Sequence, residues 1–531
     1  MSNEQPRIQI YDTTLRDGSQ AEGVSLSLED KVLIARALDE LGVDYIEGGY
    51  PLSNPKDEAF FSAVKERTIA SAKIAAFGMT RRKGVAAADD VGMKALLASG
   101  APVITIVGKC WDLHARDVLD VSEQENKAMI ADSVACCVAA GREVIFDAEH
   151  FFDGWRANRA FALGALQAAA EAGAACLALC DTNGGSRPDH VQQIVSEVCA
   201  ALPNVRVGIH CHNDSGLAVA NSLAAVAGGA THVQGTINGI GERCGNADLI
   251  AVIAALTLKY GRRCLGEDRL VRLTEVSRYV YEVTNLNFRP DQPYVGSAAF
   301  AHKAGMHVHA VRRNPVTYEH VDPAVVGNTR RILVSELSGT SNIAALTDAR
   351  FGIASDRQAQ KKVLDALMQM ESQGYQFEAA EASYDVLVRK TLAGKWYRQF
   401  WELDHFRCII QKHNAGKAVT EATVKLTIDG QAHHEVCEGG GPVDSLYGAL
   451  RAALRRRHPG VDDLHLVDYK VRVVNTAAET AAKVRVVIDW HDEHGKGYFG
   501  SVGVSENIIE ASWLALVDAV EYKLLHEMEV G

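Results

Sequence analysis

The chain has 531 residues, a formal net charge of −12 and 47% hydrophobic residues. This length predicts two to four domains with large cores, and the acidic balance argues against nucleic acid as a partner. The eleven cysteines include no CxxC pair, which is typical of reduced thiols in a cytoplasmic protein. The polar N-terminus predicts no signal peptide, and no apolar run is long enough to span a membrane.

Eight short apolar runs, rich in β-branched residues, alternate with helical stretches over the first 265 residues. Eight strand–helix units of this size are typical of a (β/α)8 TIM barrel, and a doubly wound open sheet is the competing architecture. The predicted strands are 7–12, 43–48, 73–78, 103–108, 143–148, 176–181, 206–211 and 232–237, and 28–41 and 159–172 are two of the predicted helices.

Polar residues follow most of these strands. Barrel enzymes carry their chemistry at the carboxyl ends of the strands, so this recurrence favours the barrel over the open sheet, although a single polar residue at a strand end is ordinarily a cap. The residues concerned are Arg16, Asp17, Glu47, Glu149, His150, Thr182, Asn183, His212 and Asn238.

Two histidines one residue apart end the seventh predicted strand. Side chains alternate faces along a strand, so His210 and His212 point the same way, and Asp17 follows the first strand at the same expected rim. Together they would form a 2-His-1-carboxylate set with open coordination positions, suited to Mg, Mn, Co or Zn. The competing interpretations are two histidines on an edge strand and a surface Arg16–Asp17 ion pair.

Two long segments resemble signatures of the 2-isopropylmalate/homocitrate/citramalate synthase family, whose metal-dependent barrels are related to hydroxymethylglutaryl-CoA lyase. One is 15–20 with Lys31, and the other is 208–216 running into 218–225. The resemblance covers nearly the whole chain, and segments 47–51 and 317–339 look most like the citramalate synthase branch. It implies Asn246 as a fourth metal ligand, from the glycine-rich stretch 235–248, which alone could be a phosphate-binding loop or a plain turn.

The pattern of residues 266–395 predicts helical linker subdomains. Three histidines lie close together in this sequence: His302, His307 and His309. Alone they could be a second metal site or a solvated loop. The resemblance implies that His307 reaches over the barrel mouth, in the family from the partner subunit.

Residues 396–531 predict an α+β module with a weak internal repeat. Strand 422–429 leads through a glycine-rich turn to helix 442–454, and strand 483–489 leads through the segment 495–503 to helix 507–525. Two unrelated β-hairpins with helices are the alternative. The resemblance implies an amino-acid-sensing regulatory and dimer domain, with 438–442 in its effector pocket.

The expected activity is that of an acyltransferase that condenses acetyl-CoA with a small 2-keto acid, pyruvate above all, to give citramalate for isoleucine biosynthesis. Arg16 would stabilise the developing alkoxide, and Thr182 would hydrogen-bond the keto-acid carboxylate. Glu149 and His307 are the expected bases for the acetyl methyl proton. Isopropylmalate or homocitrate synthesis, a hydroxymethylglutaryl-CoA-type lyase and a catalytically inactive amino-acid sensor are the alternatives. We expect a homodimer with a divalent metal, an amino-acid effector, no nucleic acid and no membrane partner.

Overall fold

The computed structural model describes most of the chain. The described residues are 7–66, 69–266, 268–302, 307, 310–311, 313–332, 351, 356–377, 380–412, 414, 416–474, 482–495 and 497–530. None of the helices in these ranges combines the length and apolar character that a bilayer crossing requires.

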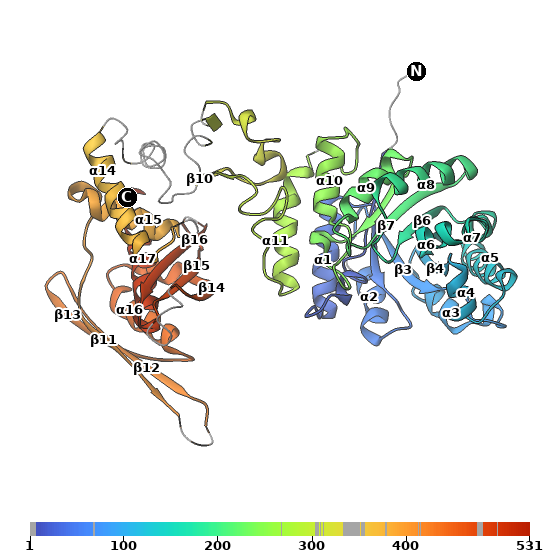
Figure 1. The fold of residues 1–531 in the computed structure, drawn as a ribbon. Helices are drawn as coiled ribbons and strands as arrows, with labels where there is room; N and C mark the ends of the chain where they lie inside the picture. The colour runs from blue at the N-terminus through green and yellow to red at the C-terminus, as the bar shows by residue number, and fades with distance from the viewer. Residues whose placement is uncertain are drawn as a thin grey trace. The chain divides into compact units, whose positions relative to one another are not determined.

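The N-terminal part is a closed barrel of parallel strands β1 to β8, in sequence order, with β1 also pairing with β8 (Figure 1). This confirms the predicted (β/α)8 barrel and excludes the open sheet. Most predicted strand bounds agree within two residues. The strands are β1 (Gln9–Asp12), β2 (Tyr45–Gly49), β3 (Lys73–Met79), β4 (Val103–Lys109), β5 (Glu143–Glu149), β6 (Cys176–Asp181), β7 (Arg206–Cys211) and β8 (His232–Gly235).

Helices follow the strands. The apolar side chains of these helices pack against the outward-facing side chains of the strands and form one large apolar core. Helix α1 shows how the sequence sets such an element. Ser27 and Asp30 form a capping box at its start, and Gly42 ends it in the left-handed conformation with φ 93°. The helices are α1 (Leu28–Leu41), α2 (Pro55–Glu66), α3 (Val91–Ala98), α4 (Asp112–Asp117), α5 (Glu123–Ala139), α6 (Phe151–Ala157), α7 (Arg159–Glu171), α8 (Pro188–Ala201), α9 (Ala218–Ala227), α10 (Leu249–Leu258) and α11 (Leu273–Val283).

The inside of the barrel is layered. An apolar layer formed around Tyr11, Tyr45 and Ile145 fills the interior toward the amino ends of the strands. Toward the carboxyl ends, strand alternation brings polar side chains inward, among them Glu47 and Asp147, which are both buried. This polar layer is the floor beneath the rim where the predicted site residues lie.

The chain after β8 differs from the prediction. Strand 232–237 was expected, but β8 ends at Gly235 and a 3-10 turn, η3 (Ile237–Gly239), follows. Asn238 adopts φ 62° inside this turn, and its side chain bonds to Ser277 and Gln292. Asn238 therefore anchors α11 to the barrel and does not face the mouth.

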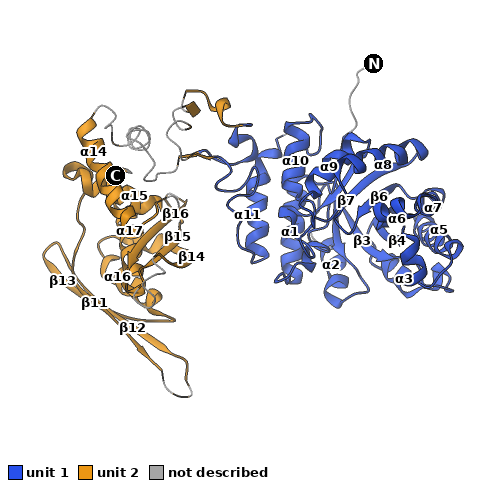
Figure 2. Ribbon diagram, viewed as in Figure 1, with its two compact units in different colours: residues 1–300, 320–330 blue, residues 301–319, 331–531 orange. Residues whose placement is uncertain are grey.

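The chain divides into two compact units (Figure 2). The first comprises residues 1–300 and 320–330, and the second comprises 301–319 and 331–531. The first holds the barrel and α11. The second holds the short parallel pair β9 (Ala301–His302) and β10 (Arg331–Ile332), helices α14 (Arg357–Ser372) and α15 (Glu381–Leu392), and the C-terminal module.

The C-terminal module is a repeat of three antiparallel strands followed by a helix. Its two sheets and helices share one apolar core. The first half is β11 (Glu402–Gln411), β12 (Val419–Ile428), β13 (Gln431–Gly439) and α16 (Pro442–Leu454). The second half is β14 (Leu464–Val473), β15 (Val484–Asp492), β16 (Gly497–Ser505) and α17 (Ile508–Val530).

The glycine-rich segment 495–503, for which no element was predicted from the sequence, lies mostly in strand β16. A Cβ added at Gly503 would lie 2.0 Å from the carbonyl oxygen of Ala511 on α17. Glycine at this position therefore lets the helix approach the sheet closely.

Candidate active site at the barrel mouth

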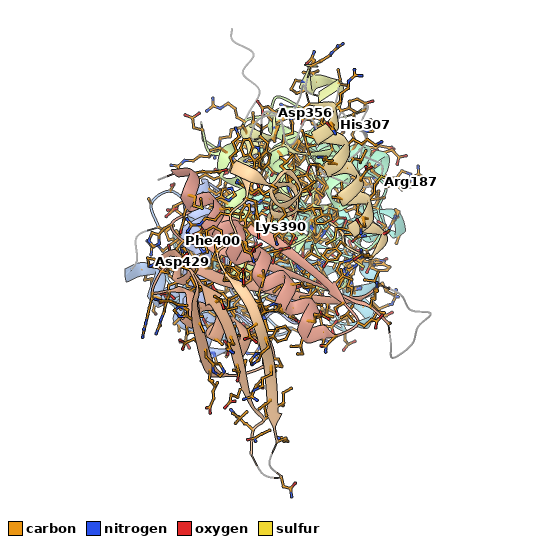
Figure 3. All side chains as sticks on the ribbon, turned by 90° about the vertical axis from the view of Figure 1, so that its left-hand side faces the viewer. Arg187, His307, Asp356, Lys390, Phe400 and Asp429 are labelled. Atoms are coloured by element: carbon orange, nitrogen blue, oxygen red, sulfur yellow. The ribbon has the colours of Figure 1, made fainter. Side chains whose placement is uncertain are left out.

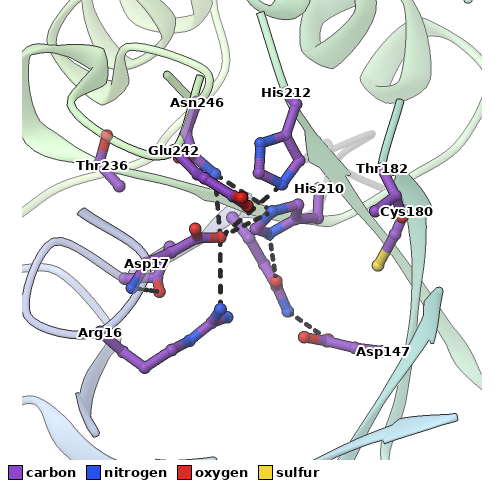
Figure 4. A network of polar contacts seen from close by, with 12 residues as sticks. Arg16, Asp17, Asp147, Cys180, Thr182, His210, His212, Thr236, Glu242 and Asn246 are labelled. Atoms are coloured by element: carbon purple, nitrogen blue, oxygen red, sulfur yellow. Dashed lines mark hydrogen bonds and ion pairs between the residues drawn. The ribbon is translucent and has the colours of Figure 1, made fainter. Parts of the chain in front are cut away.

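Three predicted metal ligands converge at the carboxyl end of the barrel (Figure 4). Asp17 follows β1, and His210 and His212 lie on and just after β7. His210 Nε2 lies 3.3 Å and His212 Nε2 lies 3.9 Å from Asp17 Oδ2. All three residues are buried, and their ligand atoms lie within 4.8 Å of one another. The three side chains are therefore arranged so that they could hold one cation.

Charge and burial act together on these ligands. Burial opposes ionisation of Asp17, but the Arg16 guanidinium and the two imidazoles hold the pKa of its carboxyl well below the usual range. Burial also opposes a charge on His210, yet the bond to Asp17 raises the pKa of this imidazole. Burial, with the neighbouring His210, lowers the pKa of His212 to about 4. Asp17 is thus an ionised carboxylate and His212 a neutral imidazole, the forms that bind metal.

Asn246 lies directly beside the trio, where the chain after β8 forms an isolated bridge with His212. Its Nδ2 donates to Asp17 Oδ2 at 3.2 Å and lies 3.2 Å from His210 Nε2. Its Oδ1 is buried and has no hydrogen-bond partner among the described residues. The two ends of an amide have nearly the same shape, so a half-turn of the amide would present this oxygen to the centre of the trio. The donor set fits a divalent cation.

Arg16 is fixed beside this centre. Its Nε donates to Glu47 Oε2 at 2.6 Å, its Nη1 lies 3.4 Å from Asp17 Oδ2, and its guanidinium carbon lies 3.9 Å from the centre of the Phe77 ring. Burial opposes the charge, but Glu47 and Asp17 raise the pKa of Arg16 above its ordinary value. The guanidinium therefore remains charged at the mouth of the barrel.

Glu149 and Thr182 occupy the same rim. Glu149 ends β5 and forms an ion pair with Lys109 at the end of β4. Thr182 follows β6, and its hydroxyl oxygen accepts the backbone N–H of His150 at 2.8 Å. Because that bond uses an acceptor position of the hydroxyl, the hydroxyl hydrogen of Thr182 is left to donate to another group.

His307 belongs to the second unit, so its position relative to the barrel mouth stays a prediction. Its side chain is exposed (Figure 3). Its ring centre lies 4.1 Å from that of Tyr318. His302 Nε2 lies 3.0 Å from the Glu319 carboxylate, within the same unit. His309 lies outside the described residues.

Sequence reasoning missed several polar residues in and around the barrel interior. Asp147 and Gln234 form a buried hydrogen-bond chain to His210, and Glu47, noted as a strand end, holds Arg16. Asp147 is two residues before Glu149 on the same strand, so both side chains point to the same face, and this alternation could have identified Asp147. His150 adopts a left-handed backbone with φ 54°, and no sequence signal marks that conformation.

Three family models match successive parts of the chain. The HMGL-like model matches residues 7–280, the homocitrate synthase post-HMGL domain-like model matches 294–375, and the LeuA allosteric (dimerisation) domain model matches 378–524. Together they cover the barrel, the linker and the C-terminal module.

Three relatives that match over nearly their whole length are (R)-citramalate synthases. The chain is 48% identical to the (R)-citramalate synthase of Geobacter sulfurreducens, over 98% of each chain. It is 47% identical to that of Aquifex aeolicus, over 99% of each chain. It is 44% identical to that of Sulfolobus acidocaldarius, over 98% of this chain and 97% of the relative.

Proposed function

The chain belongs to the family of (R)-citramalate synthases, and on that premise we propose that it condenses acetyl-CoA with pyruvate and hydrolyses the thioester, giving citramalate and CoA. One observation carries this proposal. In a chain 48% identical to such an enzyme, Asp17, His210 and His212 converge within 4.8 Å at the carboxyl end of a barrel. Barrel enzymes place their chemistry at that end.

We propose Asp17, His210, His212 and Asn246 as ligands of one divalent cation. When bound, the cation polarises the keto group of the 2-keto acid. The buried Asp17 carboxylate and the neutral His212 imidazole fit this role, as does the Asn246 oxygen, which has no hydrogen-bond partner within the described ranges. The set is oxygen and nitrogen without thiolate, which suits Mg, Mn, Co or Zn.

Arg16 and Thr182 are the proposed contacts of the keto acid. Negative charge develops on the keto oxygen as its carbon is attacked, and a fixed, charged guanidinium stabilises that charge without having to reorganise. Glu47 holds Arg16 in place for this task. The hydroxyl hydrogen of Thr182 donates to the substrate carboxylate, because its oxygen already accepts the His150 N–H.

The methyl group of acetyl-CoA must lose a proton, and Glu149 is the proposed base, assisted by His307. The carbanion that results forms the new carbon–carbon bond to the keto carbon of pyruvate. Water then attacks the thioester carbonyl, and CoA leaves as the thiol. Thioester hydrolysis makes the overall synthesis effectively irreversible, which suits a step under feedback control.

The C-terminal module supports a further part of the proposal. The match to a LeuA allosteric (dimerisation) domain over 378–524 favours a homodimer, and we propose that the module binds an amino-acid effector, isoleucine if citramalate feeds isoleucine synthesis. The segment 438–442, at the turn from β13 into α16, is the proposed part of the effector pocket.

The test is CoA release with a panel of 2-keto acids at saturating acetyl-CoA and divalent metal. Pyruvate is expected to give the highest kcat/KM, compared with 3-methyl-2-oxobutanoate and 2-oxoglutarate. The product from pyruvate should be citramalate by mass and should have one configuration by chiral chromatography. A higher kcat/KM for either longer acid would refute the substrate, and acetyl-CoA formation from citramalyl-CoA without net synthesis would refute the reaction direction.

A further inference from the structure

A buried hydrogen-bond chain crosses the barrel interior beneath the proposed metal site (Figure 4). His210 Nδ1 lies 2.9 Å from Gln234 Oε1, and Gln234 Nε2 donates to Asp147 Oδ1 at 2.8 Å. His210 and Gln234 are partners in register on the adjacent strands β7 and β8, and Asp147 comes from β5. The exposed fractions are 4%, 0% and 3% respectively, so water does not compete for these bonds.

The direction of the chain follows from its far end. Asp147 Oδ1 accepts a hydrogen bond, so the Gln234 amide presents its NH₂ group to it and its oxygen to His210. An amide oxygen is an acceptor, so His210 Nδ1 carries the hydrogen. In the neutral imidazole, the form that binds a cation, the lone pair of His210 is then on Nε2, the nitrogen that lies 3.3 Å from Asp17 Oδ2.

We propose that Gln234 and Asp147 are positioning residues that fix the tautomer and ring orientation of His210 for the cation. The inference rests on the proposed metal site and assigns it an outer layer of hydrogen bonds. Such layers orient metal-binding histidines, and their loss typically costs about 10- to 100-fold in metal affinity.

The two histidines of the site differ in this respect. His212 Nδ1 is buried without a hydrogen-bond partner among the described residues, so its ring has no comparable tether. The tethered ligand is therefore His210, and the effect of breaking the chain should act through that residue.

The experiment titrates the metal-free full-length protein with Co²⁺ and follows the visible absorption of the bound ion. Gln234→Leu removes both bonds and is expected to weaken Co²⁺ affinity by about 10- to 100-fold and to alter the absorption spectrum. Asp147→Leu removes the acceptor of the chain and should act in the same direction. Asp147→Asn keeps an accepting oxygen, so it should retain most of the affinity that Asp147→Leu loses.

Gln292→Leu is the matched control. Gln292 is also a fully buried glutamine of the barrel unit, and its side chain has hydrogen bonds to Asp248, Asn238 and Ser277, but it has no bond to His210. It should leave the Co²⁺ spectrum and affinity as in the wild type. Wild-type affinity and spectrum in Gln234→Leu, or equal losses in the Asn and Leu variants of Asp147, would overturn the inference. Failure of the wild type itself to bind Co²⁺ would instead refute the proposed metal site.

Discussion

Arg16 Nε donates to Glu47 Oε2 at 2.6 Å, while Glu47 also accepts hydrogen bonds from Tyr11 and Thr13. Glu47 is fully buried on β2, and Arg16 is on the loop after β1. The carboxylate thus has three donors and a fixed place in the barrel. The hydrogen bond from Arg16 to Glu47 therefore holds the guanidinium at the barrel mouth in the absence of substrate.

Arg16→Gln should lower kcat by about 10²–10³-fold, the usual cost of removing a group that stabilises a developing oxyanion. Glu47→Gln should act in the same direction but less, because it loosens Arg16 without removing it. Steady-state CoA release measures both effects. Arg159→Gln is the control, since Arg159 is an exposed arginine on α7. Turnover of Arg16→Gln within threefold of the wild type would contradict the assigned role.

His212→Ala should lower the bound metal from one ion per chain to none and abolish turnover, because no further His, Cys, Asp or Glu of the described residues joins this group to replace the imidazole. Metal content by mass spectrometry, with chelation and re-addition of Mn²⁺ or Zn²⁺, checks this. The control is His190→Ala, which changes an exposed histidine on α8. Full activity of the chelator-treated wild type would exclude the metal mechanism.

Glu149→Gln should slow loss of the acetyl-CoA methyl proton by about 10²–10⁴-fold, the usual worth of a general base. Pyruvate binding should change much less. Deuterium exchange into the methyl group reports the step directly. Glu143→Gln is the matched control, since Glu143 starts the same strand and pairs with Lys73 and Tyr45 at its amino end. If Glu149→Gln exchanges at the wild-type rate, His307→Ala becomes the decisive variant.

The sequence was sufficient to predict the barrel, because each strand is a short apolar run and the apolar residues of the intervening helices recur at helical spacing. It was also sufficient to predict that Asp17, His210 and His212 lie together, since His210 and His212 share a strand face and Asp17 follows another strand. The interior partners were not predictable. Gln234 and Asp147 meet only because the barrel closes and brings β8 and β5 face to face across its interior. Strand β16 was not predicted, because glycine is depleted in strands and its glycines therefore gave no strand signal.

Asp39→Asn should destabilise the barrel unit by about 1–3 kcal/mol, the cost of leaving buried donors unsatisfied. The Asp39 carboxylate accepts the backbone N–H groups of Ala70, Ser71 and Ala72 at 2.7–2.9 Å. Burial opposes its ionisation, but these bonds lower the pKa of the Asp39 carboxyl below its ordinary value. Because the folded pKa is lower than the unfolded one, the stabilisation is present above about pH 4 and is lost as pH falls through the folded value.

The measurement is the difference in thermal unfolding temperature between wild type and Asp39→Asn at pH 7 and at successively lower pH. The difference should shrink as the solution becomes more acidic. Asp189→Asn, which changes an exposed carboxylate paired with Arg187, should have little effect. A difference that grows on acidification would reverse the sign of the argument.

Removal of residues 331–531, the larger part of the second unit, should abolish regulation by an amino acid. Helix α15 packs with α17 and β16 in that unit: Arg389 bonds to Glu529 at 2.6 Å, and Val502 N donates to Ser383 at 2.9 Å. A cut after α15 would therefore expose its packed face, whereas a chain shortened after Arg330 ends with the described barrel unit and keeps His307. That chain should still bind metal and pyruvate but give no calorimetric signal with isoleucine.

In the full-length enzyme, isoleucine should lower turnover more than leucine or valine. Such inhibition requires that the protein has two arrangements and that isoleucine binds one of them more tightly than the other. Isoleucine binding by the shortened chain would place the effector site on the barrel, and a full-length enzyme indifferent to all three amino acids would leave the module as a dimerisation element.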